Sequence, residues 1–335
     1  MNHFTEYYEY VKKEFEGHVR SKLSDVKFVF FYQGSFKTGE ITICREKNEI
    51  QVLSDLEGLL ILPRLKDYLK FLIYNPEWIK EFENNIHIKT DITIHWLYYL
   101  RFIPRYYIYY ETFNNPLYFD NGVKYPQVKK WIPYINLENI YKNDIYEVLI
   151  HSSNVILKEM FNWCVNNDYT YFKLLYKISK VTLDLLVPYL FVKYKILPIS
   201  HQERVRKFCE MENNDILCQK FKDKLAIKLS GLSGENVSLY LITSSLKDYL
   251  NFVNVVQELV DINKVCLGQL SLRRRIRLPM VSCSTFRRIF TENMILLKEL
   301  LEYLLLHHNL SDAYIVKILD HLRRLKKIYP YISVQ

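Results

Sequence analysis

Glycine and proline are scarce in this chain, which contains 8 and 10 of them among 335 residues. A turn-rich all-β fold needs both residues at its many tight turns, so their scarcity argues against that class. Leucine, isoleucine, tyrosine and lysine are abundant instead, and hydrophobic residues make up 49% of the chain. The composition excludes an intrinsically disordered protein and predicts a helix-rich one, long enough for two domains.

Closely spaced cysteine pairs are also absent. The chain has six cysteines and no C-x-x-C motif. We interpret them as reduced, mostly buried thiols of a cytoplasmic protein, rather than as a disulfide framework or a zinc site.

No long hydrophobic run is free of charge. The most apolar window, 181–199, contains Asp184, Lys193 and Lys195. Each such charge costs about 2.5–3.5 kcal/mol at the centre of a bilayer, so the sequence predicts no membrane span. Residues 1–23 have the pattern of an amphipathic charged helix and not of a signal peptide, and we expect a cytoplasmic protein.

The formal net charge of +9 does not identify a partner by itself. Lysine, asparagine, isoleucine and tyrosine are abundant together, as a compositionally biased genome would produce. A positive field would nevertheless attract any polyanion, including a nucleoside triphosphate.

The first third of the chain reads as strands interrupted by helices. Residues 25–33 are rich in β-branched and aromatic side chains and end at a Gly-Ser turn, which is typical of a strand. The following segments are predicted as two strands with a polar tip (39–62), a helix (64–85), a strand (85–97), and a strand, turn and edge segment (106–125). This order predicts an α/β (α+β) domain, residues 1–127, with a small mixed sheet and helices packed on it.

From about Val128 onward, apolar residues recur at helical spacing in almost every segment. Pro126 and Pro133 interrupt the pattern where the change occurs. We therefore predict a second, all-α domain over residues 128–335.

The stretch GSFKTGEITICREKNEIQVLSDLEG, residues 34–58, carries a chemical pattern. Asp55 and Glu57 alternate on a strand, so their side chains project from one face, roughly 7 Å apart along the backbone. Two carboxylates at that spacing suit Mg²⁺, which is held by one or two carboxylates together with substrate phosphates. Gly34 and Ser35 form a turn whose backbone N–H groups and hydroxyl suit a phosphate. The combination favours phosphoryl or nucleotidyl transfer.

These residues resemble the nucleotidyltransferase signature of the DNA polymerase β superfamily: an apolar strand, Gly-Ser, then Asp-x-Asp/Glu. A third metal-binding carboxylate on a later strand corresponds to Asp91, and Gly39-Glu40 matches the Gly-Glu of many members. Downstream, the pattern of Lys180, Asp184, Glu203 and Arg204 is similar to a poorly characterised bacterial and archaeal branch.

The resemblance implies a nucleotidyltransferase that moves a nucleoside monophosphate from a nucleoside triphosphate to an acceptor hydroxyl. It implies two Mg²⁺ ions on Asp55, Glu57 and Asp91. It also implies nucleotide binding by Gly34, Ser35, Lys180 and Arg204. The acceptor is left open among a small molecule, a protein and an RNA end.

Other interpretations stay open at this point. Lys180 and Asp184 are spaced for an ordinary i, i+4 ion pair, and Arg204 suits a surface salt bridge. The basic run 271–279 suits either a solvated face or a nucleic acid. Glu57 stands where Asp is commoner, so a catalytically impaired nucleotide-binding or regulatory module is an alternative. A nucleotidyltransferase partner of a toxin–antitoxin pair is another, although the Arg-x(4–6)-His signature of a fused ribonuclease is absent.

Overall fold

The computed structural model describes residues 3–46, 49–73, 77–103, 107–140, 142–166, 170–230, 237–260, 283–307 and 311–328. The chain divides into two compact units, the N-terminal unit (1–140) and the helical unit (141–335). The predicted boundary lay after residue 127, whereas the structure divides the chain after Ile140. The difference arises because Val128, Trp131 and Ile135 pack against the core of the N-terminal unit.

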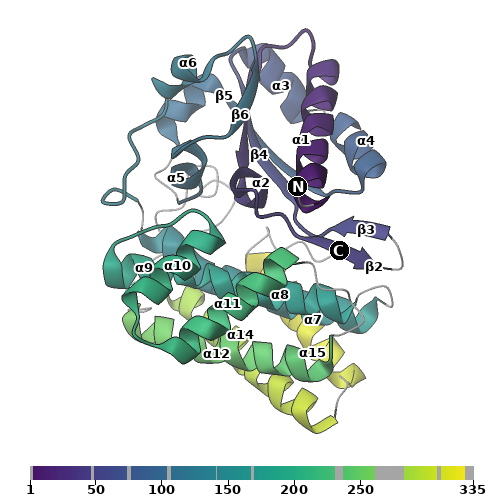
Figure 1. Ribbon diagram of the computed structural model, residues 1–335, viewed down its shortest axis with the longest axis vertical. Helices are drawn as coiled ribbons and strands as arrows, with labels where there is room; N and C mark the ends of the chain where they lie inside the picture. Colours follow the sequence, from purple (N-terminus) through teal and green to yellow (C-terminus); the bar gives the residue numbers. More distant parts are fainter. Residues whose placement is uncertain are drawn as a thin grey trace. The chain divides into compact units, whose positions relative to one another are not determined.

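The N-terminal unit is a mixed α/β structure around a four-stranded sheet of order β5-β4-β1-β6 (Figure 1). Strand β1 runs antiparallel to β4 and to β6, and β4 runs parallel to β5. The elements are α1 (His3–Lys22), β1 (Phe28–Gln33), α2 (Gly34–Thr38), β2 (Ile43–Glu46), β3 (Glu49–Val52), β4 (Leu56–Leu62), α3 (Leu65–Ile73), α4 (Glu77–Ile86), β5 (Thr90–Trp96), η1 (Leu97–Phe102), α5 (Tyr107–Phe113), β6 (Tyr118–Asn121) and α6 (Tyr125–Lys129).

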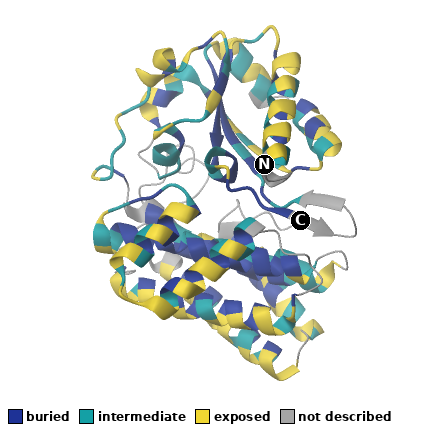
Figure 2. Cartoon of the chain, in the orientation of Figure 1, coloured by how far each residue is buried: buried dark blue, intermediate teal, exposed yellow. Residues whose placement is uncertain are grey.

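Apolar side chains cover both faces of this sheet, and the two central strands are almost entirely buried (Figure 2). On one face, Phe15 of α1 and Phe82 of α4 pack against Phe30 of β1, with ring centroids 5.1 Å apart in each Phe15 pair. On the other face, Phe31 packs with residues of η1, α5 and α6, among them Leu100. Successive side chains of each strand point into one apolar layer and then the other. A slip by one residue would move every side chain to the opposite layer, so burial fixes the register of the sheet.

One predicted strand is a helix. The tyrosine-rich segment after residue 105 was interpreted as a packed strand, but α5 occupies Tyr107–Phe113. Tyr109 and Phe113 lie one helical turn apart, stack with centroids 6.3 Å apart and pack against the sheet. Thr112 is fully buried and accepts a hydrogen bond from Nε2 of Gln33 in β1 at 2.6 Å. Tertiary packing at i, i+4 spacing thus overrides the β propensity of aromatic residues.

The strands predicted within 25–33 and 85–97 are present as β1 and β5, but residues 39–62, predicted as two strands, contain three, β2, β3 and β4, of which only β4 belongs to the four-stranded sheet. β2 and β3 form a two-stranded hairpin within the predicted polar segment, with Ile43 opposite Val52. The predicted helix 64–85 consists of α3 and α4; Pro76, where a break was expected, lies outside the described residues.

The helical unit contains helices alone among its described residues, as predicted. They are α7 (Lys142–Val165), α8 (Tyr171–Asp184), α9 (Leu186–Tyr194), α10 (His201–Met211), α11 (Asp215–Ser230), α12 (Leu239–Leu259), α14 (Cys283–His307) and α15 (Asp312–Ile328). Hydroxyl caps mark several starts: Thr170, Ser200 and Ser238 each accept a hydrogen bond from the backbone N–H three residues on. α11 was not predicted, because its lysines and apolar residues give almost no amphipathic pattern.

The interpretation of all six cysteines as reduced thiols is wrong for two of them. Cys209 at the end of α10 and Cys218 in α11 form a disulfide, with their Cα atoms 5.3 Å apart. The turn between the two helices brings the pair together, and a spacing of nine residues gave no sign of it. None of the described helices has the length and hydrophobicity required to cross a membrane.

Candidate functional site

Three carboxylates and the Gly-Ser turn lie at one end of the strands, where β1 ends and β4 and β5 begin; we call this place the sheet edge. Strand β1 ends at Gln33 and leads directly into Gly34 at the start of α2. Glu57 lies opposite Gln33 in the antiparallel pair, and Asp91 lies opposite Glu57 in the parallel pair. Paired residues on adjacent strands project to the same face, so Glu57 and Asp91 share a face. Asp55 precedes β4 by one residue and completes the group from the same end of the strand.

Asp55 and Asp91 interact electrostatically. Burial by surrounding atoms raises the pKa of Asp91, the negative charge of Asp55 raises it further, and Lys89 opposes both effects. Part of Asp91 remains exposed to solvent, so the site is accessible at this point. Two carboxylates that repel each other across neighbouring strands favour a bound cation, which would relieve the repulsion.

The turn at Gly34 requires glycine for two reasons. Its φ is +55°, in the left-handed region that side chains rarely adopt. A Cβ at this position would also lie 2.5 Å from Oε2 of Glu57. The Glu57 carboxylate therefore reaches across from β4 and lies against the backbone of the Gly-Ser turn.

Helix α2 is held in place from both sides. The hydroxyl of Tyr8 in α1 donates to the Phe36 carbonyl at 2.7 Å. From the other end, Nζ of Lys37 donates to the carbonyls of Glu111 and Asn114 near the end of α5, the latter at 2.6 Å. These contacts fix the turn relative to the sheet edge before any ligand binds.

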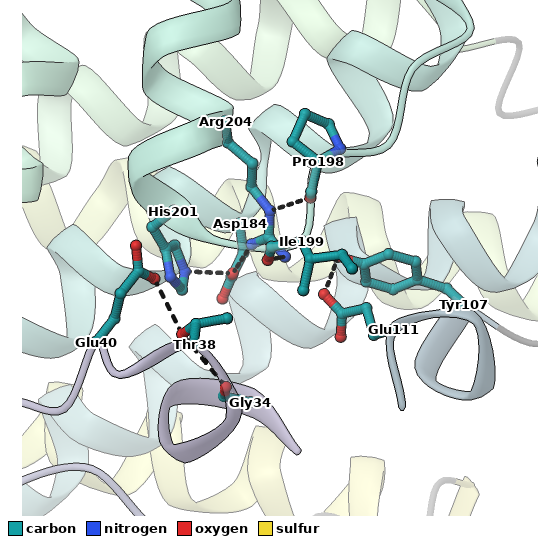
Figure 3. A network of polar contacts seen from close by, with 10 residues as sticks. All are labelled: Gly34, Thr38, Glu40, Tyr107, Glu111, Asp184, Pro198, Ile199, His201 and Arg204. Atoms are coloured by element: carbon teal, nitrogen blue, oxygen red, sulfur yellow. Dashed lines mark hydrogen bonds and ion pairs between the residues drawn. The ribbon is translucent and has the colours of Figure 1, made fainter. Parts of the chain in front are cut away.

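Lys37 is a residue that the sequence pattern did not single out. Burial lowers its pKa to about 8, and the charge of Glu111 opposes that shift. The signal was present in the sequence as a lysine two residues after Ser35, but its contacts depend on α5, which was expected to be a strand. The buried Glu40 accepts a hydrogen bond from the hydroxyl of Thr38 at 3.4 Å (Figure 3).

The chemistry of the sheet edge fits a magnesium ion in part. Its donors are carboxylate oxygens alone, which is the ligand type that Mg²⁺ prefers. Within the described residues, however, no three His, Cys, Asp or Glu side chains converge as ligands of one ion. Asp55 and Asp91 would supply two ligands, and triphosphate oxygens and water would supply the rest. Glu57 lies against Gly34 instead of completing the pair.

Arg204, one of the two predicted nucleotide ligands of the helical unit, belongs to a polar cluster around Asp184 (Figure 3), and Lys180, the other, interacts electrostatically with Asp184. Oδ1 of Asp184 accepts hydrogen bonds from Nε2 of His201 at 2.9 Å and from Nη1 of Arg204 at 3.1 Å. Arg204 is buried and also donates to the carbonyls of Pro198 and Ile199. It thus joins the loop before α10 to the end of α8. Lys180 lies one turn before Asp184 and contributes its positive charge to the cluster. Whether Arg204 and Lys180 also bind a triphosphate stays a prediction.

The Asp184 cluster yields a pH-dependent stability prediction. Burial would raise the pKa of Asp184, but the hydrogen bond and charge of His201, followed by Arg204 and Lys180, outweigh it and hold that pKa well below its usual range. The carboxylate therefore contributes stability above pH 4, the usual pKa of an unfolded Asp, and loses that contribution as the pH falls below it. We expect Asp184→Asn to lower the free energy of unfolding by about 2–3 kcal/mol at pH 7.

Urea unfolding followed by circular dichroism at 222 nm measures this difference, which should shrink as the pH falls from 5 toward 2. Asp223→Asn is a suitable control, because Asp223 is an exposed residue of α11. A loss that is equal at pH 7 and pH 3 would contradict the electrostatic explanation.

Two other sequence features stay outside this site. The basic run 271–279 and His308 lie outside the described residues. His307 ends α14, where its ring lies 4.5 Å from that of Tyr303.

Comparison of the chain with protein-family models, with curated proteins and with solved structures gives no match.

Proposed function

We propose that the chain is a nucleotidyltransferase of the polymerase β type. The support is the electrostatic interaction of Asp55, one residue before β4, with Asp91 of the neighbouring β5, at the sheet edge where the Gly34 turn begins. Three segments that are distant in sequence, residues 33–35, 55–57 and 90–91, meet there through the strand pairing. A glycine turn beside a pair of acids suits the transfer of a phosphorus-containing group, because it can hold phosphate and a divalent cation side by side.

The proposed reaction is attack of an acceptor hydroxyl on the α-phosphorus of a nucleoside triphosphate. A bond forms between the acceptor oxygen and the α-phosphorus, and the bond from that phosphorus to the β-phosphate oxygen breaks. Pyrophosphate leaves with the electron pair, and the hydroxyl proton passes to a carboxylate of the sheet edge or to water. Backbone N–H groups at Gly34 and Ser35 orient the β- and γ-phosphates of the leaving group.

Asp55 and Asp91 would hold Mg²⁺ together with oxygens of the triphosphate. When bound, the ion supplies neutralisation of the phosphate charge and lowers the pKa of a coordinated hydroxyl. The carboxylates themselves orient the triphosphate relative to the Gly34 turn. Glu57 contributes negative charge at the edge of the same site, and its place against Gly34 requires it to move aside when phosphate binds.

The experiment that tests this function compares two labels. The full chain is incubated with Mg²⁺, cell extract and each nucleoside triphosphate, labelled either on the α- or on the γ-phosphate. Nucleotidyl transfer predicts that a product acquires the α-label and that the γ-label is released in pyrophosphate. Transfer of the γ-label to a product would identify a kinase instead. The absence of any labelled product would contradict the proposed nucleotidyl transfer.

The contact between Glu57 and Gly34 favours a second candidate, a nucleotide-binding module without turnover. In that case the carboxylate, 2.5 Å from the Cβ position of Gly34, obstructs productive seating of the phosphates. Titration calorimetry with triphosphates, with and without Mg²⁺, distinguishes the two functions. Binding without pyrophosphate release identifies the module, and Glu57→Asp should then restore turnover by shortening the side chain.

A further inference from the structure

The helical unit contains a small pocket, with a cavity volume of about 80 Å³, between α8, α11 and α12. Most of its wall is apolar. Phe221 of α11 and Phe252 of α12 are buried and pack edge to face with centroids 4.7 Å apart. Leu217 and Val255 also line the pocket and are partly exposed, Val255 by 39%. The residues that line the pocket all belong to the helical unit, whereas Asp55, Glu57 and Asp91 belong to the N-terminal unit.

Two lysines and one aspartate bring charge to this apolar wall. Lys224 is buried, and its Nζ donates to Oγ of Ser245 at 2.7 Å and lies 3.3 Å from Oδ2 of Asp248. Nζ of Lys220 lies 2.7 Å from the other oxygen of the same carboxylate. A single carboxylate therefore serves two ammonium groups. The charged side chains of the lining, two lysines and one aspartate, therefore sum to +1; Lys220 is 45% exposed to solvent, and Asp223 acts on Lys224 from outside the lining.

The neighbouring groups do not balance this charge from within the pocket. Asp223 is on the exposed side of α11, where it accepts a hydrogen bond from Gln219. The remaining polar lining comes from Thr182 and Asn251, which are uncharged. Lys224 uses two of its three N–H groups in the contacts described, and an ammonium group offers three donors. Burial lowers the pKa of Lys224, while Asp248 acts in the opposite direction.

We propose that this pocket binds a small apolar monocarboxylate. Its carboxylate accepts hydrogen bonds from Lys224 and Lys220, and its hydrocarbon body lies against Phe221 and Phe252. One negative charge balances the pocket, whereas a polyphosphate would bring several charges that no donor in the lining meets. An uncharged apolar molecule would leave a buried ammonium group facing hydrocarbon, which is costly. The proposed nucleotidyl transfer does not use this pocket, so the monocarboxylate would be a second ligand of the chain besides the triphosphate.

The test uses the full chain with 3-phenylpropionate and hexanoate as probes and with 3-phenylpropanamide as the uncharged counterpart. Saturation-transfer NMR detects binding, and titration calorimetry measures the dissociation constant. We expect both carboxylates to bind. Lys224→Met should raise their dissociation constants by about tenfold or more, because it removes a charge-assisted hydrogen bond. Lys222→Met, which removes an exposed lysine of the same helix, should leave binding unchanged.

Val255→Phe tests the volume of the pocket without touching the lysines. Because Val255 is exposed at the rim, the larger ring should fill the pocket and abolish carboxylate binding while the unfolding temperature stays within a few degrees of wild type. No binding of either carboxylate, equal binding of the acid and its amide, or full binding by Lys224→Met or by Val255→Phe would each overturn the proposal.

Discussion

Asp55→Asn and Asp91→Asn are each expected to reduce transfer of the α-label by about a thousandfold or more while the fold is retained. Both substitutions keep the size of the side chain and remove one negative charge from the sheet edge. Loss of either carboxylate removes half of the coupled pair on which the proposed cation site depends. The measurement is initial velocity at saturating Mg²⁺ and triphosphate, with circular dichroism as the check on folding.

A matched control for these variants is Asp25→Asn. Asp25 is exposed and precedes β1, at the opposite end of that strand from Gly34. The variant loses the same charge from the same unit, so it should keep full activity. Equal losses in Asp25→Asn and Asp55→Asn would point to a general effect of charge and would contradict the assignment.

The coupling between the two acids can be measured without activity. Because the charge of Asp55 contributes to the raised pKa of Asp91, Asp55→Asn should lower the pKa of Asp91 toward its usual value. NMR titration of ¹³C-labelled aspartate carboxyl groups measures this pKa directly. An unchanged pKa of Asp91 in Asp55→Asn would show that the two carboxylates do not interact.

Gly58→Ala is expected to destabilise the N-terminal unit by about 3 kcal/mol. A Cβ at Gly58 would lie 1.9 Å from Cζ of Phe30. The Phe30 ring cannot retreat, because Phe15, Tyr32 and Phe119 surround it with centroids 5.1–5.2 Å away. Close packing in the core means that even one methyl group must displace either the ring or the strand.

Tryptophan fluorescence during urea unfolding measures this loss, since Trp78, Trp96 and Trp131, three of the four tryptophans, lie in the N-terminal unit. Gly17→Ala is the control: Gly17 is in the middle of α1 with nothing within 4 Å of its Cβ position. That variant should stabilise the unit by about 0.5–1 kcal/mol, because alanine is the better helix former. In the double variant Gly58→Ala/Phe30→Leu, the smaller side chain should relieve part of the stability loss that Gly58→Ala causes. If the two substitutions instead changed the free energy of unfolding additively, the proposed clash would be contradicted.

Much of the fold follows from the sequence because the local pattern and the tertiary environment agree. β1 combines β-branched and aromatic residues with burial on both faces, and its predicted and observed ends both lie at Gln33. The helix over Lys142–Val165 was predicted from apolar spacing alone. The strand register places Glu57 opposite Asp91. Among the described residues, however, no three carboxylates converge as ligands of one ion, so the shared metal site implied by the resemblance stays a prediction.

The remaining features depend on contacts that no local pattern contains. Cys209 and Cys218 meet because α10 and α11 turn back on each other, and α11 itself carries no clear amphipathic signal. Arg204 can be buried because the carbonyls of Pro198 and Ile199, six and five residues earlier, accept its hydrogen bonds. The sequence alone suggested no more than a surface salt bridge for this residue. The reach of Glu57 onto Gly34 requires knowledge of both strands at once.

The most direct test of the central claim is retention of a divalent cation by Asp55 and Asp91 in the presence of a triphosphate. Equilibrium dialysis of the full chain with Mn²⁺ and a triphosphate whose α,β-bridging oxygen is replaced by methylene measures the ion bound per chain without turnover. We expect wild type and Asp25→Asn to retain Mn²⁺ together with the nucleotide, and Asp91→Asn to lose it. Absence of Mn²⁺ from the wild-type chain, or the same retention by Asp91→Asn, would contradict the proposed site.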